Sequence, residues 1–108
     1  MLIHKEALPN NTGIVPVKLP FESGKEAREN ILHLEVQFNT PCMWFNVVRE
    51  VQKEFLIVCI GTGHDWEDKL LREEYIGSLV VAEGFYVWHY FLVDKEKFEK
   101  RLGSKDEN

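Results

Sequence analysis

The chain has 108 residues, 44% of them hydrophobic and 12% aromatic, which predicts one ordered domain and argues against disorder over most of its length. Its 13 Lys and Arg against 18 Asp and Glu give a formal net charge of −5, which disfavours a surface for long nucleic acid but not a local site for a small anion. No apolar run approaches the ~18 residues of a membrane span, so a soluble, intracellular protein is expected.

The two cysteines, Cys42 and Cys59, lie in apolar, strand-like runs. A free Cys in such a run behaves as a small hydrophobe, so both are expected to be reduced thiols, with a disulfide between neighbouring strands as the alternative. Along the chain we predict an N-terminal arm over residues 1–12, a β core over 13–93, a short helix over 94–103 and a disordered tail over 104–108.

The first predicted strand covers residues 14–19 and should lie at a sheet edge, because Pro16 cannot donate a ladder hydrogen bond. The charged stretch 22–30 that follows can form either a short helix or a loop. Residues 31–38 then alternate with period two, which is typical of a half-buried strand. Its apolar face is expected to hold Leu32, Leu34, Val36 and Phe38. Turn residues 39–41 lead into a second apolar run at 42–48, so the pair is predicted to form a hairpin.

Residues 54–60 are rich in β-branched and aromatic side chains and show no polar alternation. This pattern predicts a central strand buried on both sides. The strand leads into the sequence Gly61-Thr62-Gly63-His64, which we call the 61–64 loop. The charged residues 65–74 after it form either one helical turn capped by Asp65 or a loop.

Residues 75–82 are expected to form a strand in which Gly77 marks a bulge or a close backbone approach. Glu83 and Gly84 supply a turn to the aromatic strand 85–93, and Asp94 begins a short helix. About six short strands without a repeated strand-helix-strand unit predict a mainly β fold. We expect a small antiparallel sheet curled into a barrel or sandwich, with a short C-terminal helix.

The 61–64 loop is the strongest candidate for a binding site. Gly61 and Gly63 can adopt positive φ angles, so that successive N–H groups converge on a carboxylate or phosphate. Arg49 and Arg72 can add a planar fork to such an anion. The alternative is a tight turn shaped by a hydrogen bond from His64 to a backbone carbonyl. The loop lacks the third glycine of a dinucleotide fingerprint, and the sequence contains no phosphate-binding loop.

Two histidines could carry chemistry. His64 beside Asp65 could act as a general acid or base, with His89 assisting, which would suit a phosphoesterase. Neither Ser78 nor any other serine lies in a nucleophile elbow, so classical hydrolase chemistry is unsupported. No metal-ligand motif occurs, and we expect no metal and no cofactor.

Tyr86, Trp88 and Tyr90 share one face of the last strand, while His89 points to the other. If the aromatic face is open it forms a stacking platform for bases or sugars; if it is covered it is core or an oligomer interface. His89 is expected to be a hydrogen-bonded core or interface residue, although a place in the ligand site stays open.

Several segments together resemble a family of small bacteriophage and prophage proteins. They are Leu19-Pro20, Val36-Gln37, Thr40-Pro41-Cys42-Met43-Trp44, the 61–64 loop, Tyr75-Ile76-Gly77-Ser78 and Val87-Trp88-His89. The stretch 22–30 and the extension beyond Phe91 depart from that pattern. The resemblance implies phage origin, a compact β-rich fold and the cytoplasm of an infected bacterium. It implies no activity and no catalytic residues.

The leading functional hypothesis is a non-enzymatic, homo-oligomeric binding protein that sequesters a nucleotide-like or anionic signalling ligand to counter host defence. Its expected site residues are Arg49, Gly61, Thr62, Gly63, His64, Arg72, Trp88 and His89. The first alternative is an inhibitor that binds a host enzyme or nuclease through an acidic face. That face would comprise Glu67, Asp68, Glu73 and Glu74. The phosphoesterase is the weaker alternative.

Overall fold

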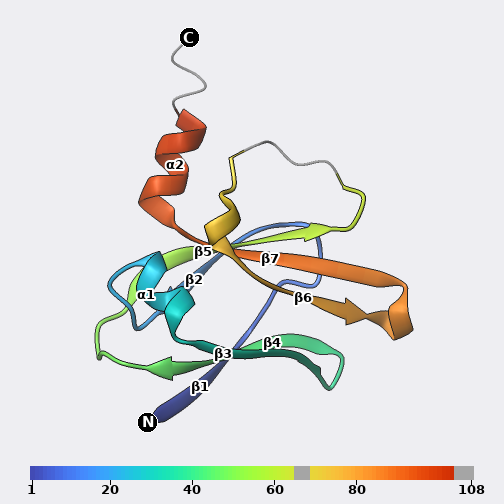
Figure 1. The fold of residues 1–108 in the computed structure, drawn as a ribbon, viewed down its shortest axis with the longest axis horizontal. Helices are drawn as coiled ribbons and strands as arrows, with labels where there is room; N and C mark the ends of the chain where they lie inside the picture. Colours follow the sequence, from blue (N-terminus) through green and yellow to red (C-terminus); the bar gives the residue numbers. More distant parts are fainter. Residues whose placement is uncertain (65–68, 104–108) are drawn as a thin grey trace.

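The computed structural model describes residues 1–64 and 69–103, which form two open antiparallel β-sheets and a short C-terminal helix (Figure 1). In chain order the elements are β1 (Leu2–Ala7), β2 (Gly13–Leu19), α1 (Gly24–Glu29), β3 (Ile31–Gln37), β4 (Thr40–Val47), β5 (Lys53–Gly61), the 3₁₀ turn η1 (Arg72–Glu74), β6 (Tyr75–Val81), the 3₁₀ turn η2 (Ala82–Gly84), β7 (Tyr86–Asp94) and α2 (Lys95–Gly103). The mainly β class is confirmed. The two sheets face each other without closing into a barrel.

The first sheet has the order β1-β4-β3 and corrects the prediction of an N-terminal arm. β1 pairs antiparallel with β4, from Leu2 opposite Val47 to Ala7 opposite Cys42. Most of its side chains are exposed, so the segment lacks the apolar alternation that marks a half-buried strand. It is held by backbone pairing, which composition does not reveal.

The second sheet has the order β2-β5-β7-β6, with β5 in its centre as predicted. The β5 side chains from Phe55 to Cys59 are all buried, because the sheet is covered on both faces. β2 lies at the edge of this sheet as predicted, a position at which a proline such as Pro16 is tolerated.

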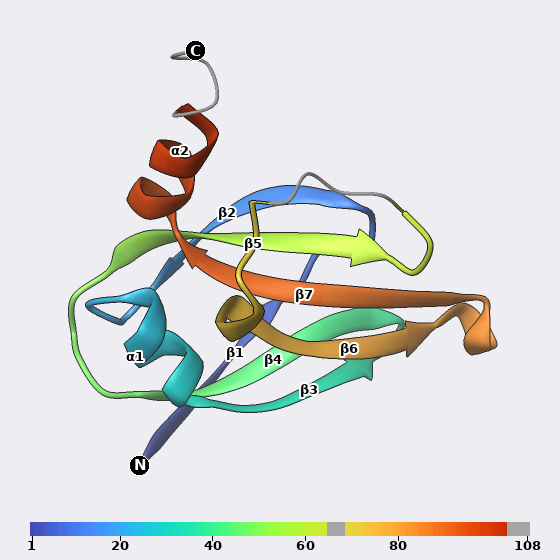
Figure 2. The same cartoon turned by 45° about the horizontal axis from the view of Figure 1, so that its top comes forward.

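Two apolar layers flank the second sheet. Figure 2 shows the first sheet beside it and α2 at the end of β7. Met43 and Phe45 from the first sheet pack against its inner face, which includes Tyr90 and Leu92. α2 covers part of its outer face and buries Phe98 there. The outer face beyond α2 carries polar side chains, described below.

The charged stretch 22–30 contains a helix. Ser23 is its N-cap, and the Ser23 side chain accepts a hydrogen bond from the Glu26 N–H at 3.1 Å. The predicted helix over 94–103 is present as α2, and Asp94 accepts a hydrogen bond from the Gly24 N–H at 2.9 Å. This contact ties α1 to the end of β7.

Both predicted hairpins are present, and their turns need positive φ angles. Phe38 and Asn39 have φ of 50° and 65° between β3 and β4, and Ala82, Glu83 and Gly84 are also positive between β6 and β7. Phe38 is 92% exposed, so the expected apolar face of the first hairpin is wrong at this residue. Leu32 is also exposed, because a bulge between Ile31 and His33 shifts the alternation.

Candidate functional site

Three segments of the sequence meet where β5 ends. The β5/β7 register places Gly61 opposite Trp88 and Ile60 opposite His89. The β6/β7 register then places Ser78 opposite His89. The 61–64 loop, the Trp88-His89 pair and the start of β6 therefore form one continuous site, with an inner side towards the first sheet and an outer side away from it.

The backbone of the 61–64 loop is largely used within the protein. The Gly61 N–H donates to Thr12 Oγ1 at 3.1 Å, the Thr62 N–H to the Val87 carbonyl at 3.1 Å, and the His64 N–H to the Gly61 carbonyl at 3.0 Å. At most the Gly63 N–H of this loop is left for a ligand. The predicted cradle of converging N–H groups for an anion is thus not formed.

His64 takes part in this anchoring. Its Nδ1 atom is hydrogen bonded to Thr12 Oγ1 at 2.8 Å. The partner is a side-chain hydroxyl from the segment before β2 rather than the backbone carbonyl considered above. His64 itself stays exposed, so its other ring nitrogen can reach a ligand.

The inner side is dominated by two stacked aromatic rings. The rings of Tyr86 and Trp88 lie 5.6 Å apart between centroids with an interplanar angle of 1°. Trp88 is 7% exposed and donates from Nε1 to Asn10 Oδ1 at 2.8 Å, whereas Tyr86 is 55% exposed. Tyr90 is core, and its hydroxyl donates to the Pro9 carbonyl at 2.8 Å. The aromatic face is therefore buried at one end and open at the other.

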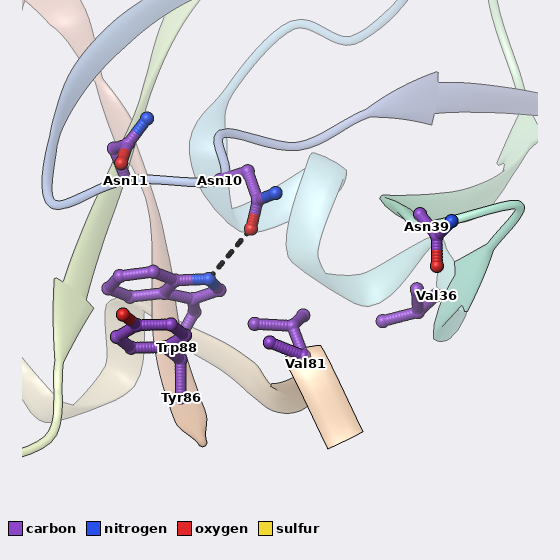
Figure 3. Close-up of a pocket in the computed structure, with 8 residues that line it drawn as sticks. Asn10, Asn11, Val36, Asn39, Val81, Tyr86 and Trp88 are labelled. Atoms are coloured by element: carbon purple, nitrogen blue, oxygen red, sulfur yellow. Dashed lines mark hydrogen bonds between the residues drawn. The ribbon is translucent and has the colours of Figure 1, made fainter. Parts of the chain in front are cut away.

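Two cavities share the Tyr86–Trp88 pair. The first, of about 440 Å³, is lined by Asn10, Asn11, Val36, Asn39, Val81, Ala82, Tyr86 and Trp88 (Figure 3). In the close-up, Val36 and Asn39 lie across from the aromatic pair. The second, of about 360 Å³, is lined by Gly61, Thr62, His64, Phe85, Tyr86, Val87 and Trp88. The predicted loop and the open aromatic face thus belong to one hollowed region.

The outer side carries a polar network of Thr62, His89, Ser78 and Tyr75. His89 Nε2 is hydrogen bonded to Thr62 Oγ1 at 2.6 Å and His89 Nδ1 to Ser78 Oγ at 2.7 Å. Ser78 is also hydrogen bonded to the Tyr75 hydroxyl. Residues three apart in a regular strand point to opposite faces, but the bulge between Tyr75 and Gly77 brings Tyr75 and Ser78 to the same one. The Gly77 prediction is confirmed.

Of the two arginines predicted for the site, the structure places one there and one elsewhere. Arg72 lies at the site, with its guanidinium 5.3 Å from the centroid of the Tyr75 ring. Arg49 does not, because it precedes β5 whereas the loop follows it, and a nine-residue strand is roughly 30 Å long. Arg49 instead forms two hydrogen bonds to the Glu26 carboxylate, at 2.8 and 2.6 Å. It is removed from the candidate site.

The expected acidic face is reduced by burial. Glu74 is only 5% exposed, and its carboxylate accepts from Arg101 at 2.6 and 3.0 Å and from the Leu71 N–H at 2.8 Å. It ties η1 to α2 and is not offered to a partner. Asp65, Glu67 and Asp68 lie outside the described residues, as does the tail over 104–108.

Other ionisable groups bear on chemistry only indirectly. Cys42 and Cys59 are free and buried, and burial raises the pKa of the Cys59 thiol to about 11. Within residues 1–64 and 69–103, no group of three or more His, Cys, Asp and Glu could hold a metal ion. In the same ranges no helix is long and apolar enough to cross a membrane.

Several residues of the site were missed. From the sequence, Asn10 and Asn11 are expected only in the N-terminal arm, Asn39 in a turn and Tyr75 in a strand, and Ser78 is considered only to exclude a nucleophile elbow. A weak signal was available, since Asn10-Asn11 lies two residues before the first predicted strand and the Tyr75-to-Ser78 segment contains a bulge glycine. Their convergence depends on strand register, which no local pattern reveals.

A family model described as a domain of unknown function (DUF7352) matches residues 2–101. The match covers most of the chain, and the chain belongs to this family. The chain matches no curated protein and no solved structure.

Proposed function

We propose that this member of the DUF7352 family is a binding protein for a small nucleotide-like ligand, which it holds in the hollowed region around Tyr86 and Trp88. The observation that carries the proposal is the parallel stack of a half-exposed Tyr86 on a buried Trp88 beside a cavity of about 440 Å³. That volume lies in the usual range of ligand pockets, roughly 300–1,000 Å³.

The walls of this cavity suit a planar, polar ring. The flat face of an aromatic side chain stacks on any nucleobase. The side-chain amides of Asn10, Asn11 and Asn39 each offer both donors and an acceptor, as the edge of a base requires. Asn10 is already fixed by the indole of Trp88, which reduces the entropy that binding would cost.

The second cavity adds contacts for the rest of such a ligand. Thr62 and His64 line this cavity together with the same aromatic pair. The net charge of the protein is −5, and the backbone N–H groups of the loop are largely hydrogen bonded within the protein. The site would therefore recognise the base and the sugar hydroxyls of a nucleotide-like ligand more than its phosphate charge. We therefore place base recognition first and anion recognition second.

The biological role that fits is stoichiometric sequestration. The resemblance to phage proteins supports this by analogy, with a signalling nucleotide of the infected bacterium as the ligand and a homo-oligomer in the host cytoplasm as the working form. The phosphoesterase with His64 and Asp65 stays the weaker alternative, because Asp65 lies outside the described residues.

A thermal-shift screen against nucleosides and mono-, di- and cyclic nucleotides tests the proposal, with mass spectrometry of the recovered ligand. A ligand at about 100 times its Kd adds about 2.7 kcal/mol to the folded state, roughly 10 °C in Tm for a domain of this size. We expect such a shift with intact ligand recovered.

The variant Tyr86→Ala should abolish the shift, since it removes the exposed ring. Val80→Ala is the matched control, because Val80 is an exposed apolar residue on the neighbouring strand that lines neither cavity. Equal shifts in both variants, or none in the native protein across the whole panel, would count against the proposal.

A further inference from the structure

The polar network on the outer side of the site contains a serine and a histidine in the relation that nucleophilic catalysis needs. We infer that Ser78 is an activated nucleophile for acyl groups, with His89 as its general base. This goes beyond the binding proposed above and uses a different face of β7.

The distances between Ser78, His89 and Thr62 fit an activated nucleophile with an oriented base. A hydroxyl becomes a useful nucleophile when a base within about 2.6–3.2 Å takes its proton and a third group orients that base. Ser78 Oγ lies 2.7 Å from His89 Nδ1, and Thr62 Oγ1 lies 2.6 Å from Nε2. With the proton of neutral His89 on Nε2, Thr62 accepts it and the Nδ1 lone pair faces the Ser78 hydroxyl.

Ser78 is accessible to a substrate from solvent. Ser78 and Thr62 are exposed and His89 is half-buried, so an electrophile can approach Ser78 from solvent while the base is held by its neighbours. The bulge before Ser78 also sets the Tyr75 hydroxyl against Ser78 Oγ. Tyr75 is thus placed to donate to an oxygen that gains negative charge next to the serine.

A positive charge lies beside the polar network. The Arg72 guanidinium lies 5.3 Å from the centroid of the Tyr75 ring, which places a permanent positive charge beside the network. This positive charge would stabilise the oxyanion that forms on the carbonyl oxygen when Ser78 attacks an ester of a small carboxylic acid. The substrate class is therefore an activated acyl ester.

The reaction balances with water as the only co-reactant. Ser78 Oγ bonds to the ester carbonyl carbon and its proton passes to His89 Nδ1. The bond from that carbon to the leaving oxygen then breaks, and His89 returns the proton to the leaving alkoxide. A water molecule, deprotonated by His89, hydrolyses the acyl-serine and regenerates Ser78 while the acid departs.

A fluorophosphonate probe tests this on the full-length protein. Ser78 Oγ would form a bond to phosphorus as fluoride leaves, and the proton would pass to His89. We expect one adduct in the intact mass, located on Ser78 by peptide mapping. Ser78→Ala should remove it, and His89→Gln should slow labelling by roughly 100-fold, the usual effect of a general base.

His33→Ala is the matched control and should label at the native rate, since His33 lies on β3 in the other sheet. Peptide mapping of the native protein keeps the test decisive even if Ser78→Ala fails to fold. Hydrolysis of 4-nitrophenyl acetate should follow the same order of variants. No adduct on the native protein, an adduct elsewhere than Ser78, or unchanged labelling in a folded His89→Gln would overturn the inference.

Discussion

Gly61 lies so close to Trp88 that a Cβ atom at this position would be 2.9 Å from Cζ3 of the indole ring. The same atom would lie 3.0 Å from Nδ1 of His64. The first glycine of the 61–64 loop therefore lets the loop pack against the aromatic strand. The fold requires the small size of Gly61 here, and not the conformational freedom that suggested an anion cradle.

Gly61→Ala should destabilise the protein, because the indole and the imidazole must both shift to admit the methyl group. The expected cost is about 1–3 kcal/mol, the usual range for overpacking a filled site. Urea unfolding measures it. Gly103→Ala is the control, since no atom lies within 4 Å of a Cβ there, and an equal loss in both variants would contradict the packing role.

Glu74→Ala should cost about 2–3 kcal/mol in the free energy of unfolding. The substitution takes a buried carboxylate from Arg101 and from the Leu71 N–H, and breaking a buried pair from one side typically costs ~3–5 kcal/mol. We expect the lower figure because the Arg101 side chain is still 24% exposed. Glu73→Ala, at the exposed neighbour in the same turn, should cost little; a similar loss in both variants would contradict the anchoring role of Glu74.

The Glu26–Arg49 pair should make stability depend on pH. The Arg49 hydrogen bonds lower the pKa of Glu26 from 4.5 to about 2. A lowered carboxyl pKa contributes stability above the unfolded pKa that is lost as pH falls towards the folded value. The native protein should thus be more stable than Arg49→Ala at pH 7, and the difference should fade between pH 4.5 and 2.

Denaturant titrations of both proteins across this range measure the difference. Lys25→Ala is the control, because its 3.9 Å contact with Glu29 is exposed. A difference between native protein and Arg49→Ala that stays constant down to pH 2 would show that the pair does not act through the Glu26 charge.

The two thiols should be unreactive in the folded protein. Both are buried, and the raised pKa of Cys59 keeps it protonated at pH 8. Ellman's reagent should therefore detect no thiol in native protein and both after denaturation. Rapid reaction of either thiol under native conditions would contradict the burial, and a denatured count of zero would indicate a disulfide.

The predictable parts of the fold are those with local signals. The continuous apolar run predicted β5, and Glu83-Gly84 predicted the second turn, where three successive residues have positive φ. β1 gave no such signal, because it is exposed and pairs with a strand some forty residues away. Side-chain alternation also failed to predict the exposure of Leu32, since a bulge shifts it.

The candidate site was predictable where its residues lie in segments with a local sequence signal. Thr62, His64, Trp88 and His89 lie in or beside segments with their own sequence signature, and the structure brings them to one end of β5. Arg49 was misplaced because a charge carries no information about its distance in the fold. The part played by Ser78 depends on the register with His89 and on a bulge, which a single sequence does not specify.

The most direct test of the account maps ligand contacts by NMR. Titrating the best ligand from the thermal screen into ¹⁵N-labelled protein should shift the Trp88 indole N–H and the side-chain amides of Asn10, Asn11 and Asn39. The signals of β1 should stay unchanged, because it lies outside both cavities. Shifts confined to other surfaces, with the Trp88 indole and the three amides unmoved, would contradict the central claim that the Tyr86–Trp88 cavity is the binding site.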